Sequence, residues 1–158
     1  MAQLKIEEFA DRMNMLIPKL KIELGCYENS ALAKRDLTAT QVLVLECLSV
    51  CGTCKMHTLV NALKSKFSAV TALMDRLVKT GLVTREHGQE DRRTVLVALS
   101  AKGRKVLQEV HDQRRSAFIQ VFSRVSQHER EEYLRILEKL VDSFTCQIEP
   151  FFKRDKSI

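Results

Sequence analysis

The chain has 158 residues, 45% of them hydrophobic, which is enough for one domain with a core of its own. No apolar run reaches about 18 residues and the charged N-terminus lacks an apolar segment, so we expect neither a membrane-spanning helix nor a secretory signal. The formal net charge is +6, and five cysteines, an odd number, fit a protein of the reducing cytoplasm rather than a disulfide framework.

The first predicted helix covers residues 4–24, where apolar residues recur at steps of three and four along one face. Pro18 lacks a backbone donor and clashes with the carbonyl of Asn14, so we expect a kink there. Residues 1–36 are interpreted as an N-terminal helix and a linker. The apolar stripe consists of Ile6, Phe9, Met13, Leu16, Leu20 and Leu24.

A second helix is predicted to begin at Thr38. Thr38 and Gln41 have the spacing of a capping box, and Leu37 and Val42 have that of a hydrophobic staple. Both devices fix the start of a helix, so the boundary is well marked.

Three cysteines and a histidine, the first of them on this helix, have the spacing C-x3-C-x2-C-x2-H. Thiolates and imidazole so close together can hold zinc or an iron–sulfur cluster, and a C-x2-C pair can act as a redox switch. Against this, the first cysteine lies among leucines, Gly52 and Thr53 are typical of an inter-helix loop, and no second C-x2-C exists. We interpret the cysteines as structural, with redox or metal sensing as the alternative. The window consists of Cys47, Cys51, Cys54 and His57.

A third helix and a hairpin are predicted next. Residues 68–82 carry an apolar stripe, and Gly81 closes the helix as a left-handed cap would. Residues 82–85 and 94–99 are β-branched runs on either side of a polar, glycine-containing segment, a strand–loop–strand signal. The stripe is Val70, Leu73, Leu77 and Leu82, and the opposite helix face carries the small or polar Ser68, Thr71, Ala72 and Asp75. A helix beside a basic hairpin has the outline of a winged helix-turn-helix.

Two helices are predicted after the hairpin. The first spans residues 104–125, and the second begins at Ser126, whose pairing with Glu129 has the capping-box pattern. Pro150 should end or bend the last helix. The inner face of the first is Leu107, Val110, Phe118, Val121 and Val125, and the stripe of the second is Tyr133, Leu137, Leu140, Phe144, Ile148 and Phe151.

The basic surplus is concentrated in one part of the chain. Residues 55–105 hold eleven Lys/Arg and four Asp/Glu, whereas the rest holds fifteen and sixteen. A solvated face explains the balanced flanks, but the surplus coincides with the predicted helix and hairpin. Phosphate binding explains it better, because each neutralised phosphate releases condensed counterions.

Five short blocks occur in a fixed order: LTxxQ from Leu37, VTALMDRL from Val70, GLVTR from Gly81, DRR from Asp91 and LSxKG from Leu99. In these blocks the chain resembles the MarR family of bacterial transcription regulators. The resemblance implies a mainly α fold with a β-hairpin wing, in which residues 37–103 form the winged helix-turn-helix and residues 104–158 form C-terminal dimerisation helices. It also implies a homodimer, double-stranded DNA with a pseudo-palindromic operator, and a small-molecule effector between the dimer helices and the DNA-reading block.

The terminal helices carry more apolar stripe than a lone winged module needs. They can either pack onto that module or pair with a second copy, and we favour the dimer because symmetric dimers dominate soluble oligomers.

The DNA contact is expected at the start of the third helix, because short side chains there let the backbone approach base edges. Ser68 and Thr71 can bond to bases or phosphates, although Ser68 can instead cap the helix. The family usually has a serine or aspartate cap where Lys66 stands, so the contact register depends on where the helix starts. The candidate residues are Lys66, Phe67, Ser68, Ala69, Thr71 and Ala72.

The hairpin tip and its neighbours supply further candidates. By resemblance, one arginine of the DRR block enters a narrow minor groove and another pairs with Asp91; we assign Arg92 to the groove and Arg93 to the pairing. Arg76 and Arg85 are expected to touch phosphate or brace the wing. By resemblance again, Lys55 and His57 lie near the start of a short helix that precedes the third helix, where the family approaches the DNA backbone.

The sequence contains no nucleophile–base–orienter pattern, HExxH motif, phosphate-binding glycine loop or dinucleotide fingerprint. We therefore expect neither an enzyme nor a cofactor or bound metal. The leading interpretation is a cytoplasmic, dimeric repressor or activator. A thiol- or metal-sensing regulator on the same fold is the second, and a protein–protein adaptor that keeps the fold but not the DNA contact is the third.

Overall fold

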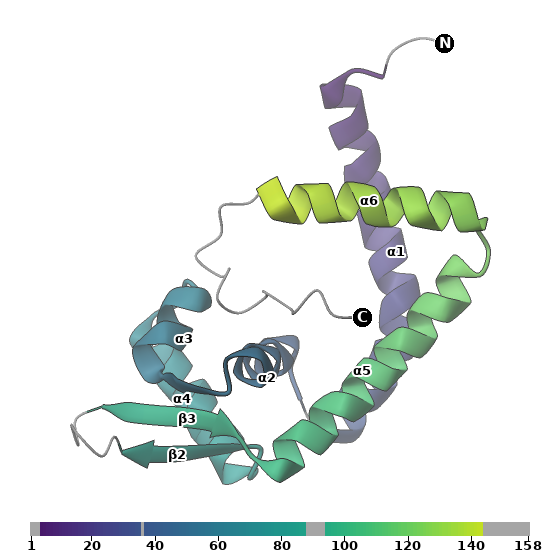
Figure 1. Ribbon diagram of the computed structural model, residues 1–158. Coiled ribbons are helices and arrows are strands. Elements are labelled where there is room, and N and C mark those ends of the chain that lie inside the picture. Colours follow the sequence, from purple (N-terminus) through teal and green to yellow (C-terminus); the bar gives the residue numbers. More distant parts are fainter. Residues whose placement is uncertain (1–3, 36, 88–93, 144–158) are drawn as a thin grey trace.

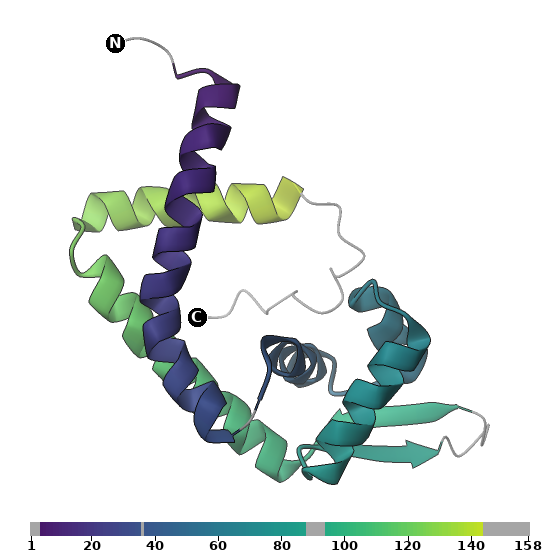
Figure 2. The same ribbon diagram turned by 180° about the vertical axis from the view of Figure 1, so that it is seen from behind.

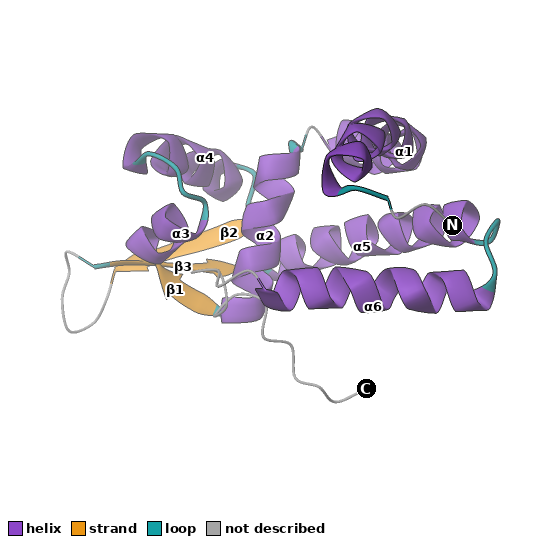
Figure 3. Cartoon of the chain, turned by 90° about the horizontal axis from the view of Figure 1, so that it is seen from above, coloured by secondary structure: helices purple, strands orange, loops and turns teal. Residues whose placement is uncertain are grey.

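The computed structural model describes residues 4–35, 37–87 and 94–143, with the side chains of 26–35 excepted. The elements of the middle of the chain gather around a small sheet, and two long helices, α1 and α5, run away from them side by side (Figures 1 and 2). Viewed from above, α1 and α6 lie on opposite sides of α5 (Figure 3). Within the described part of the chain, no helix is long and apolar enough to cross a membrane.

Helix α1 spans Ile6–Arg35 and continues through Pro18. The expected linker at the end of residues 1–36 was wrong, because the helix reaches Arg35. The segment after Gly25 contains alanine, leucine, lysine and glutamate, all of them strong helix formers, and a single glycine does not outweigh them.

Helix α2 (Ala39–Cys51) begins as predicted. The Thr38 side chain accepts from the Gln41 amide at 3.2 Å, and the Gln41 side chain accepts from the Thr38 amide at 2.7 Å. Buried apolar side chains of α2 form the centre of the core, and Val44 and Leu45 are fully buried. Helix α3 (Met56–Ala62) follows and contributes Leu59 to the same core.

Helix α4 spans Phe67–Lys79 and ends at a left-handed Gly81 with φ of 72°. Of the predicted apolar stripe, Val70 and Leu77 are buried in the core and Leu73 is partly buried against it, whereas the buried Met74 was not predicted. Leu82 is buried as well, but it lies in the turn beyond the helix. The Leu82 amide donates to the Leu77 carbonyl.

The sheet has three antiparallel strands in the order β1-β3-β2. Strands β2 (Val83–His87) and β3 (Val95–Leu99) form the predicted hairpin. Strand β1 (Thr53–Lys55) was not predicted, and the interpretation of Thr53 as loop was wrong. Three residues are too short for a periodic signal, and β1 is a strand only because Cys54 pairs with Val97 on β3.

Helix α5 spans Ala101–Phe122 and α6 spans Gln127–Ser143. Ser126 and Glu129 form the predicted capping pair, with Glu129 accepting from the Ser126 amide at 2.8 Å. Arg130 donates to the carbonyls of Phe122 and Val125 and so fixes the corner between the two helices. The later part of the predicted stripe, from Phe144 on, lies outside the described residues.

The predicted inner face of α5 was wrong at its far end. Leu107 and Val110 are buried and Val121 is half-buried, but Phe118 is exposed in the single chain, and Val125 is exposed and lies beyond the end of the helix. The reason is geometric, because α5 extends past the globular part and only its first half meets the core (Figure 1).

The start of α5 is tied to the end of α4. The Ser100 hydroxyl donates to the Gly81 carbonyl at 2.7 Å and accepts from the Gly103 amide at 2.8 Å. Lys102 donates to the Thr80 carbonyl at 2.7 Å, at the negative end of the α4 dipole. Helix α4 is therefore joined firmly to the long helix α5.

Gly103 is the point of closest approach in this junction. A Cβ atom there would lie 2.0 Å from the Leu82 carbonyl oxygen, which is backbone and cannot rotate away. We expect Gly103→Ala to lower the free energy of unfolding by about 1–3 kcal/mol or more, as overpacking does. Urea unfolding followed by circular dichroism measures this, with Lys105→Ala on the exposed side of α5 as the control. Equal stability of the two variants would contradict the close approach.

Candidate nucleic-acid interface

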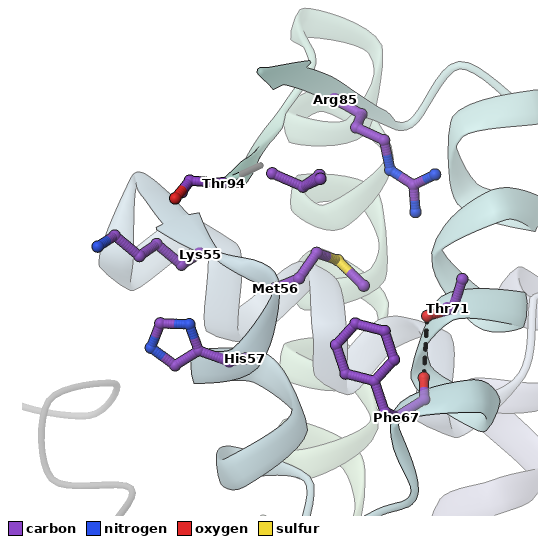
Figure 4. A pocket seen from close by; sticks show the side chains of 8 residues that line it. Lys55, Met56, His57, Phe67, Thr71, Arg85 and Thr94 are labelled. Carbon is purple, nitrogen blue, oxygen red and sulfur yellow. Dashed lines mark hydrogen bonds between the residues drawn. The ribbon is translucent and has the colours of Figure 1, made fainter. Parts of the chain in front are cut away.

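The outward face of α4 consists of side chains that the core does not use. Lys66, Phe67, Ser68, Ala69 and Ala72 are exposed and Thr71 is half-buried. The Thr71 hydroxyl donates to the Phe67 carbonyl at 2.9 Å, so its lone pairs remain free to accept from a ligand (Figure 4). Apart from Phe67 the face carries no bulky group, so a duplex can approach the helix backbone closely.

The first turn of α4 has no side-chain cap. Lys66 is the N-cap residue and makes no capping hydrogen bond, so the alternative that Ser68 caps the helix was wrong. Uncapped amides and the positive end of the helix dipole favour an anion, and the ammonium group of Lys66 adds to that field.

A groove of about 350 Å³ separates α4 from the wing and from the start of α3. Met56 and Phe67 point into it from the two helices, with Thr71 and Arg85 beside them and Lys55 and His57 at its other side (Figure 4). The groove is lined by Lys55, Met56, His57, Phe67, Thr71, Arg85, Thr94 and Val95. The structure thus brings together predicted residues from three segments of the sequence.

Arg85 forms an ion pair with the carboxylate of Asp75. Its Nη1 lies 2.8 Å from Oδ1 of Asp75, which joins strand β2 to the outward face of α4. Arg76, the other arginine predicted to touch phosphate or brace the wing, lies on the exposed surface of α4.

The wing tip, with Asp91, Arg92 and Arg93, lies outside the described residues. Their assignment to a minor groove and to an internal pair stays a prediction.

Three residues that line the groove, Met56, Thr94 and Val95, were missed from the sequence. Met56 looked like an ordinary apolar residue and the other two like the start of a strand, and only the pairing of β1 with β3 brings their segments together. The ion pair between Glu46 of α2 and Arg114 of α5, at 2.7 Å, was also missed, because the two residues are far apart in sequence.

Two of the cysteines in the predicted window face the core. Cys47 and Cys54 are buried, and burial, aided by the neighbouring Cys51, raises the pKa of each thiol to about 11. Burial also raises the pKa of Cys51. In the part of the chain that is described, no group of three potential ligands is placed to hold a metal ion. A raised pKa suppresses the thiolate, the form that reacts and binds metals.

We expect Cys47 and Cys54 to react slowly with iodoacetamide at neutral pH, about a hundredfold more slowly than in unfolded protein, because the thiolate fraction falls tenfold per pKa unit. The rate should rise as the pH approaches 11, since deprotonation then supplies the nucleophile. Mass spectrometry of timed digests measures each cysteine, and urea-unfolded chain is the control. Fast labelling of native Cys54 would favour a thiol sensor.

Comparison with known proteins agrees with this geometry. The sequence model of the MarR family matches residues 37–95. An uncharacterised HTH-type regulator of Bacillus subtilis, YfiV, is 33% identical over 98 residues, which cover 62% of this chain and 61% of that protein. The repressor MdtR of the same organism is 28% identical, with 72% and 73% covered.

A solved structure shows the same arrangement of elements. Wild-type MarR from Escherichia coli in its apo form is 25% identical, with a TM-score of 0.68, and the alignment covers 81% of this chain and 95% of that one. The sequence match, the relatives and the shared winged helix-turn-helix lead to one conclusion. The chain belongs to the MarR family.

Proposed function

We propose that the chain is a transcription regulator that binds double-stranded DNA as a homodimer. The observation that carries this is the outward face of α4, which is small, polar and basic at its start and lies beside the wing. The major groove admits such a helix, and the regulator names of the relatives agree. The names of these relatives also agree with the expectation that the chain is not an enzyme.

The contacts divide by chemistry. Ser68, Thr71 and Ala72 are proposed to read base edges, with Phe67 and Ala69 beside them. Lys66, Lys55 at the end of β1 and His57 of α3 are proposed to approach phosphates. At the tip of the wing, Arg92 is proposed to enter the minor groove and Arg93 to pair with Asp91. Arg76 is proposed as a phosphate contact near the end of α4.

The terminal helices support a dimer. No residue of α6 is buried in the single chain, and six of its large apolar side chains are exposed to solvent. Pairing with a second copy covers this surface, and a two-fold dimer presents two α4 helices to a pseudo-palindromic operator. The exposed apolar residues of α6 are Tyr133, Leu134, Ile136, Leu137, Leu140 and Val141.

Salt dependence tests the DNA contact directly. With on the order of six to ten phosphate contacts per dimer, affinity should fall about 10³- to 10⁵-fold between 50 and 200 mM salt. Fluorescence anisotropy with a duplex selected by the protein from a random library measures this, and a shuffled duplex of equal length is the control. A flat titration would favour the protein–protein adaptor.

Control by a small molecule is part of the same proposal, as a ligand that changes the spacing of the two α4 helices would change affinity for the operator. The thiol- or metal-sensing alternative is less well supported, because Cys47 and Cys54 are buried with raised pKa values.

A further inference from the structure

Asp75 is an unexpected residue on a surface that should face phosphates. It lies on the outward side of α4, one turn after Thr71, and its side chain is 57% exposed. An unpaired carboxylate in this position would repel a duplex. Its partner is Arg85 of β2, at 2.8 Å, so the charge that would repel DNA is neutralised from the wing.

The pair lies where the wing leaves the core. The inner side of α4 is held by the buried Met74 and Leu77, and the first residue of β2, Val83, is buried as well. The side chains of Thr84, Arg85 and Glu86 are exposed, so this part of β2 is held to the core through its pairing with β3 and not by side chains packed against α4. In the described ranges 37–87 and 94–143, no other ion pair joins α4 to the wing.

We propose that Asp75 and Arg85 form a positioning pair, which holds the wing at a fixed angle to α4 so that both fit one duplex together. Arg85 then acts through Asp75 and is not itself a phosphate contact. A partly exposed pair adds little to global stability, so its effect lies in this orientation. The inference rests on the proposed binding of DNA by α4 and the wing.

The two possible roles of Arg85, phosphate contact and positioning of the wing, predict opposite changes in DNA affinity for the substitution Asp75→Asn. If Arg85 only supplies charge, Asp75→Asn removes a repulsive carboxylate and frees the guanidinium, so binding tightens. If the pair positions the wing, Asp75→Asn weakens binding, and Arg85→Gln weakens it by a similar factor.

A double-mutant cycle on the full chain separates these readings. With a duplex selected by the wild-type protein, we expect each single variant to bind about three- to tenfold more weakly. The double variant should be no weaker than either single one, because the second substitution has no interaction left to remove. As the matched control, Asp75→Asn combined with Arg76→Gln should show additive effects. Tighter binding by Asp75→Asn, or additive effects in the Asp75/Arg85 cycle, would overturn the inference.

A measurement without DNA keeps the inference separate from the proposed function. Amide hydrogen exchange in the free protein should become about three- to tenfold faster in residues 83–87 and 95–99 of both single variants, and should stay unchanged in α2. Unchanged exchange in the hairpin overturns the positioning role. If the wild-type chain selects no duplex while exchange responds as expected, the proposed function fails and the coupling of wing to helix stands.

Discussion

Thr71→Glu should abolish sequence-specific DNA binding. Thr71 lies on the outward face of α4, and its hydroxyl bonds only to the Phe67 carbonyl of its own helix, so the fold loses little when it is replaced. Glutamate is a good helix former, but its charge would meet phosphates and base edges. With about 2 kcal/mol lost at each of two half-sites, affinity should fall about 10³-fold or more.

The matched control for this variant is Ser116→Glu. The Ser116 hydroxyl donates to the carbonyl four residues earlier, at 2.9 Å, as Thr71 does, but it lies on α5 outside the basic segment. Anisotropy with the selected duplex should show wild-type affinity for Ser116→Glu and none for Thr71→Glu, while circular dichroism and sedimentation stay unchanged in both. Wild-type affinity of Thr71→Glu would remove α4 from the interface.

The start of α2 and the inner face of α4 could be predicted because their signals are local. Thr38 and Gln41 are three residues apart, and the stripe of α4 repeats within one helix, so neighbouring residues suffice to specify them. Strand β1, the groove residue Thr94 and the partner of Glu46 could not be predicted. Each depends on a contact between segments far apart in sequence, and nothing near Thr53 or Glu46 carries a trace of it.

Arg85 shows the same limit within the candidate site. The sequence placed it in the basic segment and left two roles open, phosphate contact or brace of the wing. Its distance from Asp75, ten positions earlier, depends on the turn at Gly81, which folds β2 back along α4. Charge composition therefore indicates a candidate interface but cannot assign roles to the residues within it.

The far end of α5 was mispredicted for a different reason. An apolar stripe identifies a face that will be buried, but not which molecule will bury it. Phe118 is 43% exposed and Val125 is 38% exposed in the single chain, next to the equally exposed stripe of α6. The proposed dimer accounts for both, because the side chains are buried by a second copy and not by their own domain.

Breaking that dimer should have the second large effect. Leu137 and Leu140 are 43% and 50% exposed, and no residue of α6 belongs to the core, so Leu137→Glu with Leu140→Glu should leave the winged region folded. Four charges would then face each other across the two-fold axis. We expect the chain to sediment as a monomer and its affinity for the selected duplex to fall about 10²- to 10⁴-fold, because the second half-site is no longer bound in the same complex.

Lys139→Glu, an exposed charge change between the two leucines, is the matched control and should remain dimeric. Circular dichroism and urea unfolding establish that the double variant is folded before its affinity is compared. If that variant sediments as a dimer with wild-type affinity, α6 lies outside the interface. A monomeric variant that still binds with full affinity would instead mean that each protomer reads DNA alone. The observed exposure of α6 argues against both outcomes, because six large apolar side chains on one helix are costly to leave in water and gain most from a partner that carries the same surface.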